Sequence, residues 1–288
     1  MFLQPASLNA AIDLLAQHGG RLLAGGTDFF PAQGQGLGQA AVRQPLIDIS
    51  RLPELRAISV GPDSIRLGAA SSWSEIVAAP LPRGFDALKT AAREIGSVQI
   101  QNRGTIGGNL CNASPAADSV PPLLTLDARV ELASPRGQRE MPLTAFIRGN
   151  RQTALEADEI VTAVLVPRAN GDLTSHFAKL GARRYLVISI AMISVALRRH
   201  ADGAIADARV AIGSCSAVAQ RLPELEAALL GCRSVSDIAD CVTVGRLARL
   251  TPIDDVRASS AYRRDAAAIL IRRAVQDCFT TRSAVGGR

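Results

Sequence analysis

The order of helix-like and strand-like segments constrains the fold of this 288-residue chain more than any other feature. Apolar residues recur at helical spacing in the segment LNAAIDLLAQHGG, which follows Ser7 as an N-cap candidate. Short strand patterns come next, in RLLAGGTD, PLIDIS, LRAISV and SIRLGAA, separated by Gly and Pro signals. Because strands and helices then continue without regular βαβ alternation, the sequence predicts an α+β fold and argues against a doubly wound sheet.

The chain divides into three predicted sections. Residues 1–55 form a small mixed α/β unit. Residues 56–172 hold the amphipathic helix FDALKTAAREIG, a glycine-rich segment, and strands at RVELAS and EIVTAVLVP. A boundary is expected at Pro167 and the polar stretch RANGD. Residues 173–288 then begin with strands at HFAKLG, VISIAMISVALRR and ARVAIGSC and end in helices.

Composition excludes several classes of protein. The formal charge of +6 comes from dispersed arginines, and aromatic residues make up only 3%, which argues against nucleic-acid binding. No apolar run reaches the roughly 20 residues of a membrane span. The amino terminus shows no secretory signal, so a cytoplasmic location is expected. The five cysteines and three histidines have no metal-ligand spacing, and we expect neither a metal site nor a catalytic residue in this chain.

Two glycine pairs carry the strongest functional signal. Ala24–Asp28 reads AGGTD after an apolar strand, and Thr105–Asn109 reads TIGGN. Small residues let backbone N–H groups converge on an anion, because no Cβ blocks the approach and positive φ is accessible to glycine. Neither segment matches the dinucleotide fingerprint GxGxxG or the phosphate loop of nucleoside triphosphatases. Each alone is typical of a tight turn, but together they predict a clamp around a diphosphate.

A resemblance extends over nearly the whole chain. The segments LLAGGTDFFPA, QIQNRGTIGGNLCNASPAADSVPPLLTLDA, EIVTAVLVP and HFAKLGARR…ISIAMISVAL resemble, in this order, those of the FAD-binding medium subunits of molybdenum hydroxylases, the family of xanthine and carbon monoxide dehydrogenases. The resemblance implies an FAD-binding fold of the vanillyl-alcohol oxidase type, with two α/β subdomains at 1–55 and 56–172. Residues 173–288 would then be the carboxy-terminal α/β domain.

The same resemblance implies a set of residues that contact FAD. The first glycine segment would wrap the diphosphate and the second would close on it, while further polar positions would bind other parts of the cofactor. Lys179 would lie near the isoalloxazine and stabilise its negative charge on reduction. The implied contacts are Leu23, Ala24, Gly25, Gly26, Thr27, Asp28, Gly104, Thr105, Gly107, Gly108, Asn109, Asn112, Ser114, Asp118, Val161 and Lys179.

Several of these residues also have a purely structural interpretation. Asp118 precedes a predicted helix and would serve as its N-cap. Asn109 and Asn112 would satisfy loop backbone groups. Lys179 would be a solvated strand residue, and Val161 an ordinary core residue.

The resemblance further implies an electron-transfer role. FAD would receive electrons from two [2Fe–2S] clusters of a small subunit and pass them to NAD⁺, dioxygen or another carrier, while a molybdenum-bearing large subunit oxidises the organic substrate. Cys111 lies where some family members insert a cluster-binding loop, which is missing here. A dimer of heterotrimers is expected, and Tyr185 is a further candidate for the flavin face. The alternatives are a stand-alone flavin oxidoreductase of the same fold and a flavin-free scaffold subunit.

Overall fold

The computed structural model describes residues 1–34 and 44–281. Its contacts divide the chain into two compact units that interleave along the sequence. We call unit 1 the residues 1–79, 95–114 and 128–168, and unit 2 the residues 80–94, 115–127 and 169–288. Each unit is described by itself.

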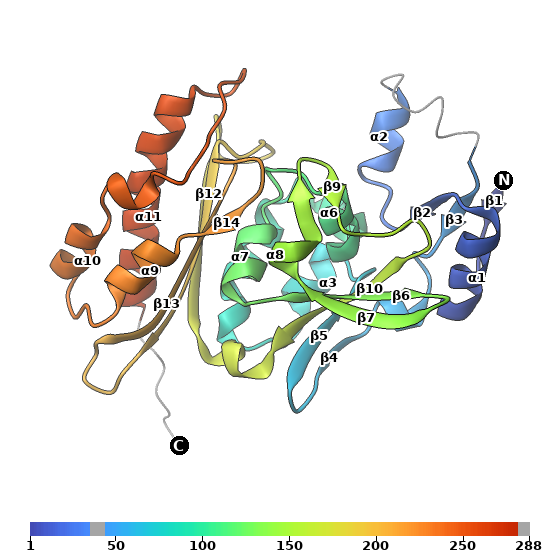
Figure 1. The fold of residues 1–288 in the computed structure, drawn as a ribbon, viewed down its shortest axis with the longest axis horizontal. Coiled ribbons are helices and arrows are strands. Elements are labelled where there is room, and N and C mark those ends of the chain that lie inside the picture. The colour runs from blue at the N-terminus through green and yellow to red at the C-terminus, as the bar shows by residue number, and fades with distance from the viewer. Residues whose placement is uncertain (35–43, 282–288) are drawn as a thin grey trace. The chain divides into compact units, whose positions relative to one another are not determined.

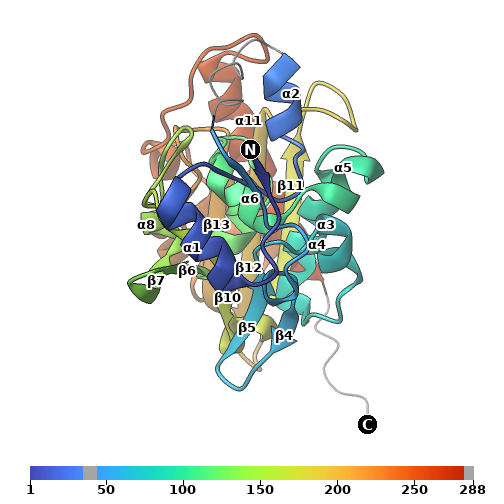
Figure 2. The same ribbon diagram turned by 90° about the vertical axis from the view of Figure 1, so that its right-hand side faces the viewer.

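Unit 1 contains three sheets. A parallel three-stranded sheet has the order β1-β3-β2, and an antiparallel five-stranded sheet has the order β4-β5-β10-β6-β7, with β4 and β7 at its edges (Figure 2). A small β8–β9 hairpin completes the set. The strands are β1 (Phe2–Leu3), β2 (Arg21–Leu23), β3 (Leu46–Asp48), β4 (Ile58–Val60), β5 (Ser64–Gly68), β6 (Arg129–Ser134), β7 (Gly137–Pro142), β8 (Ile147–Gly149), β9 (Gln152–Thr153) and β10 (Ile160–Pro167).

The helices of unit 1 are short and begin at side-chain caps. The Ser7 hydroxyl accepts from the amide of Ala10 at 3.2 Å. Ser72 and Glu75 form a reciprocal capping box, in which the Glu75 carboxylate accepts from the Ser72 amide at 2.7 Å. Such caps satisfy amides that a helix cannot bond internally. The helices are α1 (Leu8–His18), α2 (Phe29–Gly34), α3 (Trp73–Ala78), α5 (Val98–Arg103), α6 (Ile106–Asn112) and α8 (Leu143–Phe146).

Unit 2 is built on one antiparallel sheet with the order β11-β12-β13-β14. Helices cover both of its faces, α9, α10 and α11 on one and α4 and α7 on the other (Figure 1). The strands are β11 (Thr174–Leu180), β12 (Ala191–Arg199), β13 (Ile205–Gly213) and β14 (Gln220–Arg221), and the helices are α4 (Asp86–Glu94), α7 (Val120–Thr125), α9 (Pro223–Leu229), α10 (Val235–Cys241) and α11 (Ser260–Thr280).

Strand β12 shows why helices cover both faces of this sheet. Ile193, Val195 and their alternate neighbours pack in the core under α9–α11. Met192 points the other way, against Ala87 and Ala91 of α4, and the Ser194 hydroxyl lies 3.1 Å from that of Thr125 in α7. Because successive strand residues face opposite sides, a nearly continuous apolar strand requires cover on both.

The α+β class predicted from the sequence is confirmed. The three-section division at residues 55 and 172 stays a prediction, although each main sheet lies within one section. One strand was placed too early, because β12 begins at Ala191 and not at Val187. Across the described ranges, every helix is too short or too polar to traverse a bilayer.

Candidate functional site

The first glycine segment is a loop in unit 1 whose amides find no acceptor among the described residues, although the carbonyls of Gly26 and Asp28 accept from Phe30 and Ala32. It follows β2, and Gly26 adopts the left-handed conformation with φ 74°. Within the described residues, the amides of Gly25, Gly26, Thr27 and Asp28 donate no hydrogen bond. Consecutive unpaired amides around a left-handed residue form a concave anion-binding nest. The loop therefore has the backbone that a diphosphate requires.

The second glycine segment is not the loop that its glycines suggested. Ile106–Asn112 is helix α6, and Thr105 is its N-cap, with the hydroxyl accepting from the Gly108 amide at 3.1 Å. Two glycines lower intrinsic helix propensity, but the cap and the bonds to neighbouring backbone outweigh that loss.

The first amides of α6 are already bonded inside the protein. The Ile106 amide donates to the Ser71 carbonyl at 3.1 Å, and the Gly107 amide donates to the Ala69 carbonyl at 2.8 Å. A Cβ built at Gly107 would lie 2.7 Å from both the Cβ and the carbonyl oxygen of Ala69. Gly107 thus permits a close approach of two backbones. The prediction that this segment forms a second backbone nest is wrong.

The two glycine segments nevertheless meet. A Cβ built at Gly25 would lie 1.9 Å from the carbonyl oxygen of Arg103 and 3.0 Å from the Cα of Gly104. The Asn112 side-chain amide donates to the Asp28 carboxylate at 3.0 Å, which joins the end of α6 to the first loop. Residues separated by about 80 positions in the chain therefore form one continuous surface in unit 1.

A buried ion pair dominates the polar interior of unit 2. Lys179 on β11 donates to Asp118 at 2.6 Å, and its side chain is only 8% exposed. The Ser189 hydroxyl donates to the other Asp118 oxygen at 2.5 Å. Burial raises the pKa of Asp118, while the Lys179 ammonium and the Ser189 hydroxyl oppose that rise. The two carboxylate oxygens each have a partner, as a buried charge requires.

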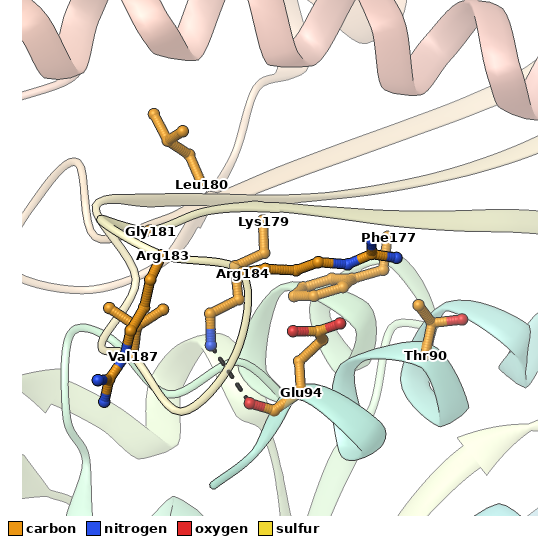
Figure 3. Close-up of a pocket in the computed structure, with 9 residues that line it drawn as sticks. All are labelled: Thr90, Glu94, Phe177, Lys179, Leu180, Gly181, Arg183, Arg184 and Val187. Carbon is orange, nitrogen blue, oxygen red and sulfur yellow. Dashed lines mark hydrogen bonds between the residues drawn. The ribbon is translucent and has the colours of Figure 1, made fainter.

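Lys179 also lines a cavity of about 320 Å³ in unit 2 (Figure 3). Its ammonium group points to the Glu94 carbonyl oxygen at 3.4 Å. The Arg184 side chain extends toward Phe177, and that of Arg183 lies beside Val187. The cavity is lined by Thr90, Glu94, Phe177, Lys179, Leu180, Gly181, Arg183, Arg184 and Val187.

The structure decides some of the purely structural interpretations of the predicted site residues. Asp118 is not a helix cap, because α7 begins after Ser119 and has no side-chain cap bond. Lys179 is not solvated, because it is buried and paired. Val161 lies in the core of the five-stranded sheet and matches its structural interpretation. Tyr185 is 58% exposed and lies outside the cavity lining.

The remaining predicted residues lie in unit 1. Leu23 is buried at the end of β2, Ala24 is half-buried, and Ser114 follows the end of α6. Asn109 is half-buried on α6. None of the predicted FAD contacts is tested by this geometry alone, and they remain predictions.

Sequence reasoning missed Arg151 and Ser189, whose side chains hydrogen-bond to Asn112 and Asp118, respectively. Arg151 lies in none of the quoted segments, and Ser189 lies in ISIAMISVAL, where nothing in the local pattern marks it as a partner of Asp118. Within the described residues, no three His, Cys, Asp or Glu side chains gather closely enough to hold a metal ion.

Backbone amides with no acceptor among the described residues, gathered on an α+β scaffold, suit an anionic group such as a diphosphate. A family model for the FAD binding domain in molybdopterin dehydrogenase matches residues 1–169, and one for the CO dehydrogenase flavoprotein C-terminal domain matches residues 176–278. The chain therefore belongs to the FAD-binding medium subunits of molybdenum hydroxylases, and FAD is its cofactor.

Individual relatives agree with this assignment. The chain is 32% identical over 277 residues to the nicotine 6-hydroxylase medium subunit of Paenarthrobacter nicotinovorans, covering 95% of each. It is 42% identical over 196 residues to the nicotinate dehydrogenase FAD-subunit of Eubacterium barkeri, covering 66% of this chain and 65% of that protein. A solved carbon monoxide dehydrogenase from Hydrogenophaga pseudoflava superposes with a TM-score of 0.83 at 28% identity, covering 95% of both chains.

The residues of the first loop fit FAD. Neither Gly25 nor Gly26 has room for a side chain, since a Cβ at Gly26 would lie 2.6 Å from the Phe30 ring and one at Gly25 would lie 1.9 Å from the Arg103 carbonyl oxygen. The loop amides would be available as donors to one diphosphate. The second segment contacts the first loop at Arg103 and Gly104, but the amides of Ile106, Gly107 and Gly108 are already bonded within the protein.

Proposed function

We propose that this chain is the electron-transfer subunit of a cytoplasmic complex, in which it holds FAD between the [2Fe–2S] clusters of a small subunit and a final acceptor. FAD supplies the ability to take up electrons singly and release them in pairs. The proposed partners are that small subunit and a large subunit with the molybdenum cofactor, assembled as a dimer of heterotrimers. NAD⁺ and dioxygen are the proposed acceptors.

The free amides of the first loop carry this proposal. They give the chain a means of binding FAD by its diphosphate, independent of any organic substrate. Relatives named as medium chains, such as the carbon monoxide dehydrogenase medium chain of Hydrogenophaga pseudoflava, support an assembly of several subunits. The family assignment argues against a flavin-free scaffold.

Reconstitution tests this function against a stand-alone oxidoreductase. The chain loaded with FAD is expected to leave aldehydes and N-heterocycles unoxidised when alone. Addition of the proposed iron–sulfur and molybdenum subunits is expected to give substrate-dependent reduction of the FAD, followed by reduction of NAD⁺ or dioxygen. Turnover of an organic substrate by the isolated chain would contradict the proposal and support the stand-alone enzyme.

Lys179 is proposed to set the redox potential of the bound flavin. Removal of its charge by Lys179→Gln is expected to lower the two-electron midpoint potential by about 30 mV, equivalent to a tenfold change in the equilibrium. The matched control is Lys89→Gln, which removes the only other lysine charge of the chain. Spectroelectrochemical titration measures both variants. Equal potentials would show that Asp118 already neutralises Lys179, leaving the ion pair with a structural role only.

A further inference from the structure

Arg151 occupies an unusual backbone position beside the end of helix α6. It lies in the turn between β8 and β9 with φ 55°, a left-handed conformation that an L-residue other than Gly, Asn or Asp adopts rarely. Its amide donates to the carbonyl of Ala113 at 2.9 Å, and Ala113 ends α6 with φ 45°. A glycine would adopt this φ with less strain, and a strained non-glycine residue suggests a functional role for its side chain.

That side chain begins a line of hydrogen bonds to the first glycine loop. The Arg151 guanidinium donates to the side-chain oxygen of Asn112. The Asn112 side-chain nitrogen in turn donates to Asp28 at 3.0 Å. A guanidinium has no acceptor, so it bonds only the oxygen of an amide and leaves the amide nitrogen to face Asp28. Because the Asp28 carboxylate can only accept, Arg151 and Asp28 favour the same orientation of the Asn112 amide, and Arg151 reinforces it from the oxygen side.

The orientation of Asn112 matters because of the charge on Asp28. A carboxylate in a loop that binds a diphosphate repels the ligand unless a hydrogen bond holds it away from the diphosphate. A donor from Asn112 ties Asp28 to α6, and the Arg151 charge polarises the Asn112 amide and strengthens that donor. If the Asn112 amide were reversed, its oxygen would face the Asp28 carboxylate, and the hydrogen bond between α6 and the loop would be lost.

We propose that Arg151 is a positioning residue for FAD binding, acting through Asn112 to hold the Asp28 loop in its anion-binding conformation. The inference rests on the proposed role of that loop. Arg151 is exposed, and exposed polar pairs contribute little to folding. Its loss is therefore expected to weaken cofactor binding without unfolding unit 1.

The test measures FAD affinity of the apo chain by quenching of flavin fluorescence. Arg151→Met is expected to raise the Kd about tenfold, a change of about 1.4 kcal/mol. Arg151→Lys is expected to recover part of that loss, because it keeps a donor and the charge. Arg148→Met is the matched control: Arg148 is exposed on the same hairpin and makes no hydrogen bond to any described residue. The thermal midpoint of each apo variant reports on folding.

A double-mutant cycle distinguishes action through Asn112 from direct contact. In an Asn112→Ala background, Arg151→Met is expected to cause no further loss of affinity. Additive losses would overturn the proposal, as would an unchanged Kd in the single variant or an equal loss in Arg148→Met. Failure of the wild-type chain to bind FAD would overturn the proposed function as well, whereas normal wild-type binding with an unaffected Arg151→Met variant would remove only this inference.

Discussion

Gly25→Ala is expected to weaken FAD binding by about 100-fold or more. The added Cβ would lie 1.9 Å from the Arg103 carbonyl oxygen, so one of the two backbones must move. The first loop is half-buried, and its amides from Gly25 to Asp28 donate no hydrogen bond within the described residues, whereas Gly104 caps helix α5. The loop is therefore expected to move, not Gly104. A shift of the loop misaligns amides that must converge on one diphosphate. Isothermal titration with FAD measures the effect.

Two other glycines provide the controls. Gly68→Ala places a Cβ 2.3 Å from the Leu55 carbonyl oxygen, a clash that involves no residue of the first loop. It is expected to lower the stability of unit 1, read from the fluorescence of Trp73, the single tryptophan, while FAD affinity is retained by the folded fraction. Gly245→Ala meets no atom within 4 Å and is expected to change neither quantity. FAD binding by Gly25→Ala at wild-type affinity would show that this loop does not hold the cofactor.

Arg263→Met is expected to destabilise unit 2 by about 3 kcal/mol, the usual cost of removing one partner from a buried ion pair. The Arg263 side chain is 3% exposed and donates to Asp255 at 2.7 Å. It also donates to the carbonyls of Ile190 at 2.5 Å and Ser214 at 3.1 Å, so one side chain joins α11 to two other segments. Its removal takes the guanidinium donor from the two carbonyls and from Asp255, which keeps its hydrogen bonds from Arg257 and Ala258.

Urea unfolding followed by circular dichroism measures this loss. The matched control is Arg264→Met, which removes an exposed charge from the adjacent position of the same helix and is expected to change stability by less than about 0.5 kcal/mol. If the two variants unfold at the same urea concentration, Arg263 does not stabilise unit 2.

The Arg263 pair also predicts a pH dependence. Burial acts to raise the pKa of Asp255, but hydrogen bonds from the Arg257 amide and the Arg263 guanidinium outweigh it and lower the pKa to about 2. A carboxyl whose pKa is lowered on folding stabilises the protein above its unfolded pKa, near 3.8, and loses that contribution as the pH falls through 2. Between pH 4 and pH 2 the wild type is therefore expected to lose stability more steeply than Arg263→Met.

Local signals in the sequence predict the helix starts well. Ser7 was identified as an N-cap because a short hydroxyl side chain before an apolar run satisfies free amides, and this cap is present. The strand patterns likewise lie on β2 to β6 and β10, since alternation and Gly or Pro boundaries are local features.

Helix α6 shows where local reasoning fails. Its glycines oppose a helix, and the bonds that stabilise it run to Ser71 and Ala69, more than 30 residues earlier in the chain. Lys179 and Asp118 are 61 residues apart, and nothing in either local pattern indicates that they pair. The Arg151 to Asp28 connection likewise depends on folding. The candidate residues were thus found from the resemblance, while their partners required the structure.

Hydrogen exchange of the first loop tests the central claim most directly. The amides of residues 24–28 are expected to exchange rapidly in the apo chain and to be protected when FAD or ADP is added, because both ligands carry the diphosphate. Riboflavin, which lacks it, is expected to leave these amides unprotected. Bound FAD with no protection of residues 24–28 would contradict the account, because the diphosphate would then be held elsewhere.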